Sequence, residues 1–201
     1  MNPDTPPATS AGLDAGHRPV SPRSWGAVAL VWSFAEATFF FIVADVFLSW
    51  IALRNRRAAW RSCLWAAAGS VLGGAVMFTL GRLDPTGARA FIEGVPAISP
   101  ALVDQSASLL ARQGSGALFS GMVTGRPYKV FAVLAGTSGL SLPGFLAASF
   151  AARLLRFGLV AALAGWLAHG PLHAWSQRRK VLLHLTVWTA IYAIYFGWFG
   201  F

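Results

Sequence analysis

Charged side chains are scarce in this sequence, and acidic ones are the scarcer sign. Only 11% of the 201 residues are charged, with 7 Asp and Glu against 16 Lys and Arg, while 56% are hydrophobic. The mean hydropathy of +0.57 is far above that of an ordinary soluble domain of this length. The composition therefore predicts an integral membrane protein.

The sequence lacks the residues that several functional classes of protein require. The single cysteine, Cys63, excludes a disulfide framework and a thiolate metal site, and we expect it to be a small buried hydrophobe. No Ser-His-Asp set, metal-ligand cluster or cofactor loop is found, so we expect no enzyme, cofactor or metal. His169, His173 and His184 are expected at the membrane interface. The net charge of +9 does not indicate a nucleic-acid partner, because the arginines lie between and inside apolar runs.

The first 24 residues lack any apolar stretch that could form a signal-peptide core. They are rich in Pro, Thr, Ser, Ala and Gly, a composition that predicts a disordered tail over residues 1–24. Arg18 and Arg23 stand just before the first apolar run, as anchors on the cytoplasmic side would.

That first apolar run covers residues 26–53, which is longer than one helical crossing of a hydrocarbon core of about 30 Å. Arginines flank both of its ends, and four of them lie between residues 54 and 61. A simple crossing would leave one cluster outside, against the positive-inside tendency. We therefore predict a re-entrant hairpin that enters and leaves on the cytoplasmic face.

The rest of the chain divides into further membrane segments. Residues 62–81, 143–168 and 181–201 each fit a single transmembrane helix, and the last is rich in Trp and Tyr. Residues 82–113 form a mixed polar linker that suits the outer side. Residues 115–142 are apolar but interrupted by GRPYK and by a Gly and Pro series, which predicts a second re-entrant hairpin.

A hairpin followed by a transmembrane helix thus occurs twice within residues 25–168. One crossing lies between the two starting points, so the second unit would begin from the opposite face. This is the plan of an inverted repeat, in which broken segments meet near the midplane and form a binding site. The predicted fold class is an all-α integral membrane protein with two such units and a C-terminal transmembrane helix.

Two acidic residues, Glu36 and Asp45, lie inside the first apolar run. An ionisable group at that depth costs several kcal/mol unless it is paired or hydrated. On one continuous helix, their nine-residue spacing would put them on opposite faces, whereas in a hairpin they could converge. One explanation is that each acid pairs with an arginine and merely holds the helices together.

Four basic residues follow at membrane depth in the second half: Arg126, Lys129, Arg153 and Arg156. The last two are three residues apart and share one helix face. Should all six charged residues enter one cavity, two positive charges would be in excess, which suits a phosphate group. The alternative is that Arg126 and Lys129 extend to the membrane interface.

At these residues the sequence resembles the DedA or VTT-domain (SNARE-associated) family, and most closely its short YqaA-type members. The resemblance covers about residues 25–168 and rests on EATFFFIVADVFL at 36–48, on a glycine pattern that ends at Gly81, and on RPYKVFAVLAGTSGLSLPGFLAASFAARLLRF at 126–157. No proline precedes Asp45 in the first motif, and Phe78 stands where the family usually has Tyr. The residues expected to serve the hairpins and close helix packing are Gly69, Gly73, Gly74, Gly81, Pro127 and Gly136.

The resemblance implies a multi-pass protein of the bacterial inner membrane that moves phospholipids or polyprenyl phosphates between leaflets, in some members coupled to the proton gradient. By this resemblance Glu36, Asp45, Lys129, Arg153 and Arg156 form the substrate and proton site, with Arg126 the less regular member. Membrane lipids are the expected partners, and a homo-oligomer is compatible with this reading. Two alternatives stay open: a carrier for an ion or small solute, and a scaffold that transports nothing.

Overall fold

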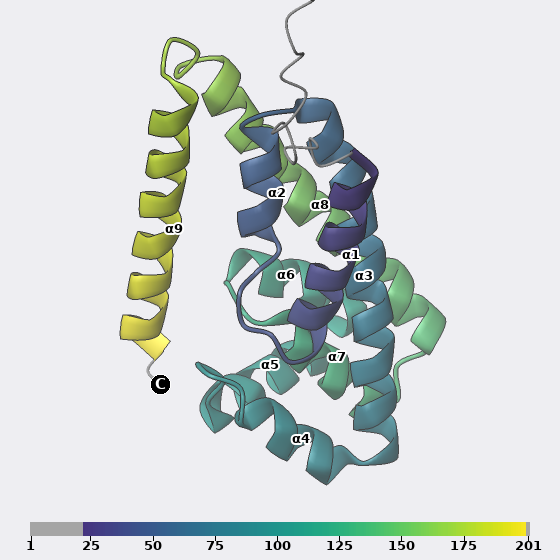
Figure 1. Cartoon of the computed structure of the whole chain (residues 1–201). Helices are drawn as coiled ribbons and strands as arrows, with labels where there is room; N and C mark the ends of the chain where they lie inside the picture. Colours follow the sequence, from purple (N-terminus) through teal and green to yellow (C-terminus); the bar gives the residue numbers. More distant parts are fainter. Residues whose placement is uncertain (1–21, 200–201) are drawn as a thin grey trace, which may run out of the picture.

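The computed structural model describes residues 22–199, and every regular element in that range is helical. Most of the tail predicted over residues 1–24 therefore lies outside the described residues. The elements are α1 (Pro22–Thr38), α2 (Asp45–Ala52), α3 (Arg56–Leu83), α4 (Pro85–Glu93), α5 (Pro100–Gln113), the 3-10 turn η1 (Gly114–Gly116), α6 (Ala117–Val123), α7 (Tyr128–Thr137), α8 (Leu142–His169) and α9 (Gln177–Phe199) (Figure 1).

Three of these helices, α3, α8 and α9, are long and apolar enough to cross a membrane, which indicates a membrane protein. They occur where the sequence predicts transmembrane helices. α3 begins at Arg56 instead of residue 62, because the Asn55 side chain accepts a hydrogen bond from the backbone N–H of Ala58 and caps the helix there. Three of the four arginines after the first apolar run, Arg56, Arg57 and Arg61, thus belong to the first turns of α3, and Arg54 precedes its cap.

The first apolar run folds back on itself as two antiparallel helices, α1 and α2. Trp25 lies against Trp50 with ring centroids 6.1 Å apart, and Trp32 stacks on Phe47 at 5.8 Å. Residues 39–44 between the helices are not helical. The backbone in this segment is held partly by side chains, since the Trp32 indole N–H donates to the carbonyl of Ile42 at 3.0 Å.

The helices pack in one repeated pattern around α3 and α8, which contact each other. α1 packs on α3 while α2 reaches α8, and in the second half α6 packs on α8 while α7 reaches α3. The first arm of each folded-back segment therefore contacts the long helix that follows it. The second arm contacts the long helix of the other half, and α2 also contacts α3.

Glycines let α3 approach α1 and α7 closely. A Cβ atom at Gly69 would overlap the backbone carbonyl of Leu30 in α1, and one at Gly81 would overlap that of Val133 in α7. Small residues at such positions permit helix backbones to touch in a membrane. The other predicted packing glycines lie at the same two contacts: Gly73 toward α1, Gly74 toward α7 and Gly136 on the α7 side.

The predicted polar linker at 82–113 contains two helices, α4 and α5, that the polar composition did not reveal. Each begins at a side-chain cap, Asp84 for α4 and Ser99 for α5, followed by proline in the first turn. Arg89 of α4 forms an ion pair with Asp104 of α5 at 2.8 Å and ties the helices together. This cap and proline combination is the sequence signal for both helices.

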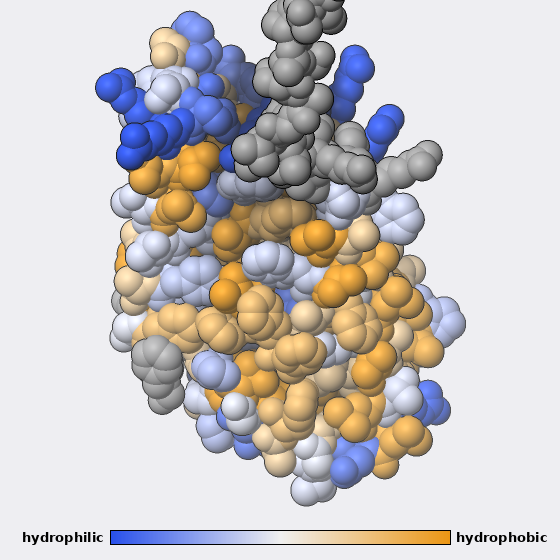
Figure 2. Space-filling model, in the orientation of Figure 1, coloured by the Kyte–Doolittle hydropathy of each residue, from blue (hydrophilic) through white to orange (hydrophobic). Residues whose placement is uncertain are grey.

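The C-terminal helix α9 stands apart from the rest (Figure 1). Only 6% of an apolar 18-residue stretch of α9 is buried, against 50% for the corresponding stretch of α3 and 33% for that of α8, so α9 is held by few contacts. Figure 2 shows apolar side chains across the middle of this face and hydrophilic ones gathered toward its upper end. That distribution is expected of a surface that faces a bilayer and ends in water.

Candidate functional site

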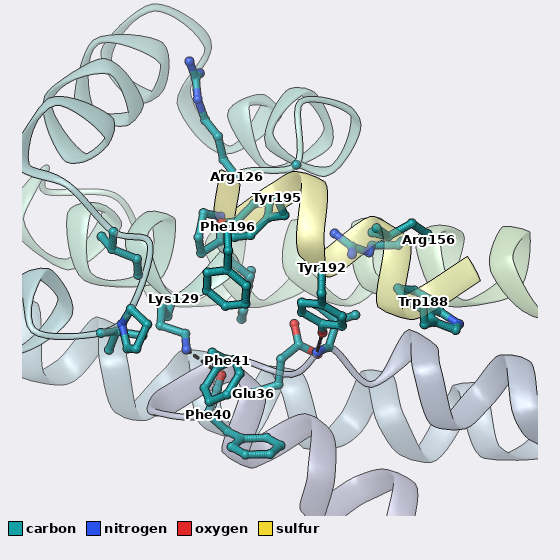
Figure 3. Close-up of a pocket in the computed structure, with 18 of the residues that line it drawn as sticks. Glu36, Phe40, Phe41, Arg126, Lys129, Arg156, Trp188, Tyr192, Tyr195 and Phe196 are labelled. Atoms are coloured by element: carbon teal, nitrogen blue, oxygen red, sulfur yellow. Dashed lines mark hydrogen bonds between the residues drawn. The ribbon is translucent and has the colours of Figure 1, made fainter. Parts of the chain in front are cut away.

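A cavity of about 200 Å³ brings together residues from both folded-back segments, α8, α9 and the loop between α4 and α5 (Figure 3). Five of the six predicted charged site residues line it: Glu36, Arg126, Lys129, Arg153 and Arg156. The sixth, Asp45, is 1% exposed and lies behind Arg156, with which it forms an ion pair. The predicted site residues are therefore neighbours in space, although they are up to 120 positions apart in the sequence.

Glu36 lies in the last turns of α1 and connects three parts of the chain. Its Oε2 atom is 2.6 Å from Nη2 of Arg153 on α8. The same oxygen accepts a hydrogen bond of 3.1 Å from the backbone N–H of Ala44, on the far side of the non-helical segment. One carboxylate thus fixes both the turn of the first segment and its contact with α8.

Asp45 begins α2 and binds the second arginine of α8. Its Oδ2 atom accepts hydrogen bonding from Nε of Arg156 at 2.7 Å and lies 2.6 Å from Nη2 of the same residue. The two arginines lie three residues apart on α8 and bind acids on the two arms of the first segment: Arg153 pairs with Glu36 of α1, and Arg156 pairs with Asp45 of α2. The two acids converge, and both are neutralised by arginine within the protein.

Two serines that the sequence did not single out hold Arg153 in place. Nε of Arg153 donates to the hydroxyl of Ser70 on α3 at 3.0 Å, and Ser70 is 2.6 Å from the hydroxyl of Ser33 on α1. All three side chains are buried. No sequence signal marks these serines, because lone serines in apolar helices are common and only the helix crossing places them together.

Lys129 is the buried cation that has no carboxylate partner. Its side chain is 4% exposed and Nζ donates to the carbonyl of Phe40 at 2.7 Å. Within the range 22–199, no Asp or Glu lies within ion-pair distance of it. An ammonium group has three donors, so two remain for the cavity.

Arg126 occupies a different position from the other basic residues. It is half-buried, and its Nη2 atom donates to Oε1 of Gln105 on α5 at 3.2 Å. Figure 3 shows its side chain directed away from the other labelled residues. The alternative of a side chain that extends to the membrane interface therefore remains open for Arg126, whereas Lys129 is buried among the helices.

The turn that presents Arg126 and Lys129 depends on its local sequence. Gly125 has φ +72°, a left-handed conformation that glycine adopts readily. Pro127 follows with φ −62° immediately before the first residue of α7. This Gly and Pro combination ends α6 and starts α7, as the predicted break in 115–142 requires.

The C-terminal helix supplies an aromatic wall that the sequence analysis did not assign to the site: Trp188, Tyr192, Tyr195 and Phe196. The Tyr192 hydroxyl accepts a hydrogen bond from the backbone N–H of Val43 at 2.8 Å, and Trp188 Nε1 donates to Ser49 at 3.1 Å. The four-residue spacing of His184, Trp188, Tyr192 and Phe196 is the signal that could have found this face.

His184 lies at the contact between the C-terminal helix and α2. It is 9% exposed, and its Nε2 atom is hydrogen-bonded to Ser49 at 2.9 Å, while its expected position at the membrane interface stays a prediction. The contact with α2 accounts for its burial, and nothing in the local sequence announces that contact.

In chemical terms the site is amphipathic. Two carboxylates, Glu36 and Asp45, face the buried cations Lys129 and Arg153 and the partly buried Arg156, which leaves one positive charge among these five. Aromatic rings form much of the remaining wall. Across residues 22–199, no three His, Cys, Asp or Glu side chains form a group that could hold a metal ion. Such a site suits an anionic group attached to an apolar one.

Comparison with known proteins finds a similar sequence in an uncharacterized protein of Haemophilus influenzae (strain ATCC 51907 / DSM 11121 / KW20 / Rd). The two are 31% identical over 136 residues, which cover 67% of this chain and 69% of the relative. No family model matches the chain. No solved structure matches it either.

Proposed function

The chain belongs to the same family as the uncharacterized Haemophilus influenzae protein, and from the charges of its cavity we propose that it moves an anionic lipid between membrane leaflets. The observation that carries this proposal is Lys129. Its ammonium group is buried, lacks a carboxylate partner among the described residues and has two unused donors facing a cavity. The resemblance to DedA or VTT-domain proteins implies the same activity for a phospholipid or a polyprenyl phosphate.

Energetics favour a ligand at Lys129 over a purely structural role. A charged group at membrane depth costs several kcal/mol unless it is paired. The arginines do not share this property, because Glu36 and Asp45 already neutralise them. A phosphate oxygen at Lys129 would supply the missing counter-charge through a charge-assisted hydrogen bond.

The packing pattern supports two re-entrant hairpins related as an inverted repeat. When α1, α2 and α3 are exchanged for α6, α7 and α8, the contacts of α1 with α3 and of α2 with α8 become the observed contacts of α6 with α8 and of α7 with α3. A two-fold arrangement of this kind places a binding site where the broken segments meet. In the proposed setting, a bacterial inner membrane, that site lies near the midplane.

The proposed cycle uses the ion pairs as releasable contacts. An anionic headgroup enters the cavity and binds Lys129 while its chain remains in lipid. Protonation of Glu36 or Asp45 would then break a pair with α8 and free an arginine to compete for the headgroup. Movement between leaflets would thereby couple to proton uptake.

Leaflet exchange of a labelled anionic lipid in proteoliposomes tests the proposal. Wild-type protein should accelerate exchange, and Lys129→Ala and Glu36→Gln should each abolish the acceleration. Lys129→Arg should retain part of it because the charge is kept. Arg112→Ala is the matched control, because Arg112 is an exposed arginine that does not line the cavity.

A parallel measurement of solute flux separates the two competing functions. Flux of a small anion without lipid movement would identify a carrier for ions or solutes. The absence of both, with Lys129→Ala changing only thermal stability, would identify a scaffold. Either result contradicts lipid translocation.

A further inference from the structure

A second hollow, larger and almost entirely apolar, lies between the first folded-back segment and α9. It has a volume of about 810 Å³ and is open to the surroundings. Ile42 and Val46 line one side, and Leu185, Thr189 and Ala193 line the other. We call it the α9 groove.

The α9 groove shares a wall with the charged cavity. Trp188, Tyr192 and Phe196 line both hollows. The wall is closed by the hydrogen bond from Val43 to Tyr192, at 2.8 Å, and by the contact of Phe196 with the ring of Phe41, at 6.0 Å. One row of side chains therefore separates the charged residues of the cavity from the apolar α9 groove.

This wall belongs to the least buried of the three long helices. Only 6% of the apolar 18-residue stretch of α9 is buried, against 50% of that of α3. The polar contacts between α9 and the first segment include hydrogen bonds of Trp188, His184 and Tyr192, which can break and re-form without opening a packed core. Passage of a ligand between the two hollows would require α9 to move away from α2.

We propose that the α9 groove holds the hydrocarbon chain of the anionic lipid whose headgroup occupies the cavity at Lys129. The inference rests on the proposed function and specifies its substrate as a lipid with a chain that lies along α9. The groove extends from Leu185 to Gly197, or about 18 Å of helix at 1.5 Å per residue. That length covers more than half of a hydrocarbon core of about 30 Å.

The position of the groove relative to the charges favours a lipid chain over other occupants. An anionic lipid needs a cation for its headgroup and an apolar surface beside it for its chain. The shared row of Trp188, Tyr192 and Phe196 makes the cavity at Lys129 and the apolar α9 groove direct neighbours. A second copy of the chain would cover the groove without any need for Lys129 nearby.

Photolabelling tests where the chain lies. The probe is a phosphatidic acid with a diazirine in one acyl chain, incorporated with the protein into phosphatidylcholine bilayers. Labels should concentrate on residues 42–46 and 185–197, about tenfold above the lipid-facing surface of α3. A phosphatidylcholine with the same diazirine chain should label all apolar surfaces evenly.

Matched variants of α9 sharpen the result. Ala193→Trp fills the groove and should reduce labelling by the phosphatidic acid probe about tenfold. Ala190→Trp makes the same change at an exposed residue outside the groove and should leave labelling unchanged. Gly197→Leu is a second filling variant, and a Cβ atom there meets nothing within 4 Å, so folding is not at risk.

The outcomes distinguish this inference from the proposed function. Even labelling by both probes would show ordinary surrounding lipid and would overturn the inference, as would full labelling of Ala193→Trp. The inference would also be overturned if a second copy of the chain could be cross-linked to α9 and thereby prevented labelling of the α9 groove. Specific groove labelling without leaflet exchange would support the lipid site while contradicting translocation.

Discussion

Removing either partner of the ion pair between Glu36 and Arg153 should destabilise the protein strongly, because it leaves the other charge buried without a partner. Both side chains are buried, at 8% and 5% exposure, and the charged atoms are 2.6 Å apart. Glu36→Gln leaves a buried guanidinium without its counter-charge, and Arg153→Met leaves a buried carboxylate. Breaking one partner of a buried pair costs about 3–5 kcal/mol.

Replacing both partners should cost far less than the sum of the two single losses. Neutral or apolar replacements of a whole buried pair are often tolerated, since no unpaired charge remains. We therefore expect Glu36→Gln with Arg153→Met to recover at least about 2 kcal/mol relative to additivity. The pair between Arg89 and Glu93 is the control, because its atoms are 2.8 Å apart but its side chains are 43% and 25% exposed.

The assay is a double-mutant cycle on the free energy of unfolding, measured by denaturant titration in mixed micelles with far-UV circular dichroism. The control pair should yield a coupling energy below about 1 kcal/mol, as exposed ion pairs do. Equal coupling energies at the two pairs would refute the reasoning. Additive losses at Glu36 and Arg153 would refute it as well.

Two further predictions concern packing and the aromatic wall. Gly69→Ala should destabilise the protein by about 1–3 kcal/mol, because its Cβ would overlap the carbonyl of Leu30; thermal unfolding in detergent measures this loss, and an unchanged melting temperature would contradict the close helix crossing. Tyr192→Phe removes the acceptor of the Val43 N–H and should speed amide hydrogen exchange in α9 while leaving α3 unchanged. Unaltered exchange in α9 would mean that this hydrogen bond does not hold the helix.

The sequence predicted the long apolar helices and the break in the first apolar run. Both predictions depend only on the length of an apolar segment and on the charges inside and beside it, which can be read from neighbouring residues. Glu36 and Asp45 could be identified as members of a site, since an acid inside an apolar run must find a partner. Their convergence followed from the predicted hairpin. Which arginine each would bind did not follow, because α1, α2 and α8 meet only in the tertiary structure.

The sequence could not predict which basic residues are paired with acids and which one faces the cavity without such a partner. Arg153, Arg156 and Lys129 have the same formal charge, yet two are neutralised by acids and one faces the cavity with free donors. The serines beside Arg153 and the role of α9 as a wall were also missed. Each depends on contacts between segments that are distant in the chain.

The central claim is that Lys129 is the cation that selects an anionic headgroup. The most direct measurement is the ratio of leaflet exchange rates for a phosphatidic acid and a phosphatidylcholine with identical chains, in wild-type protein and in Lys129→Met. A charge-assisted hydrogen bond of about 1.5–3 kcal/mol predicts that the ratio falls about 10- to 150-fold in Lys129→Met. An unchanged preference for the anionic lipid in that variant would contradict the account.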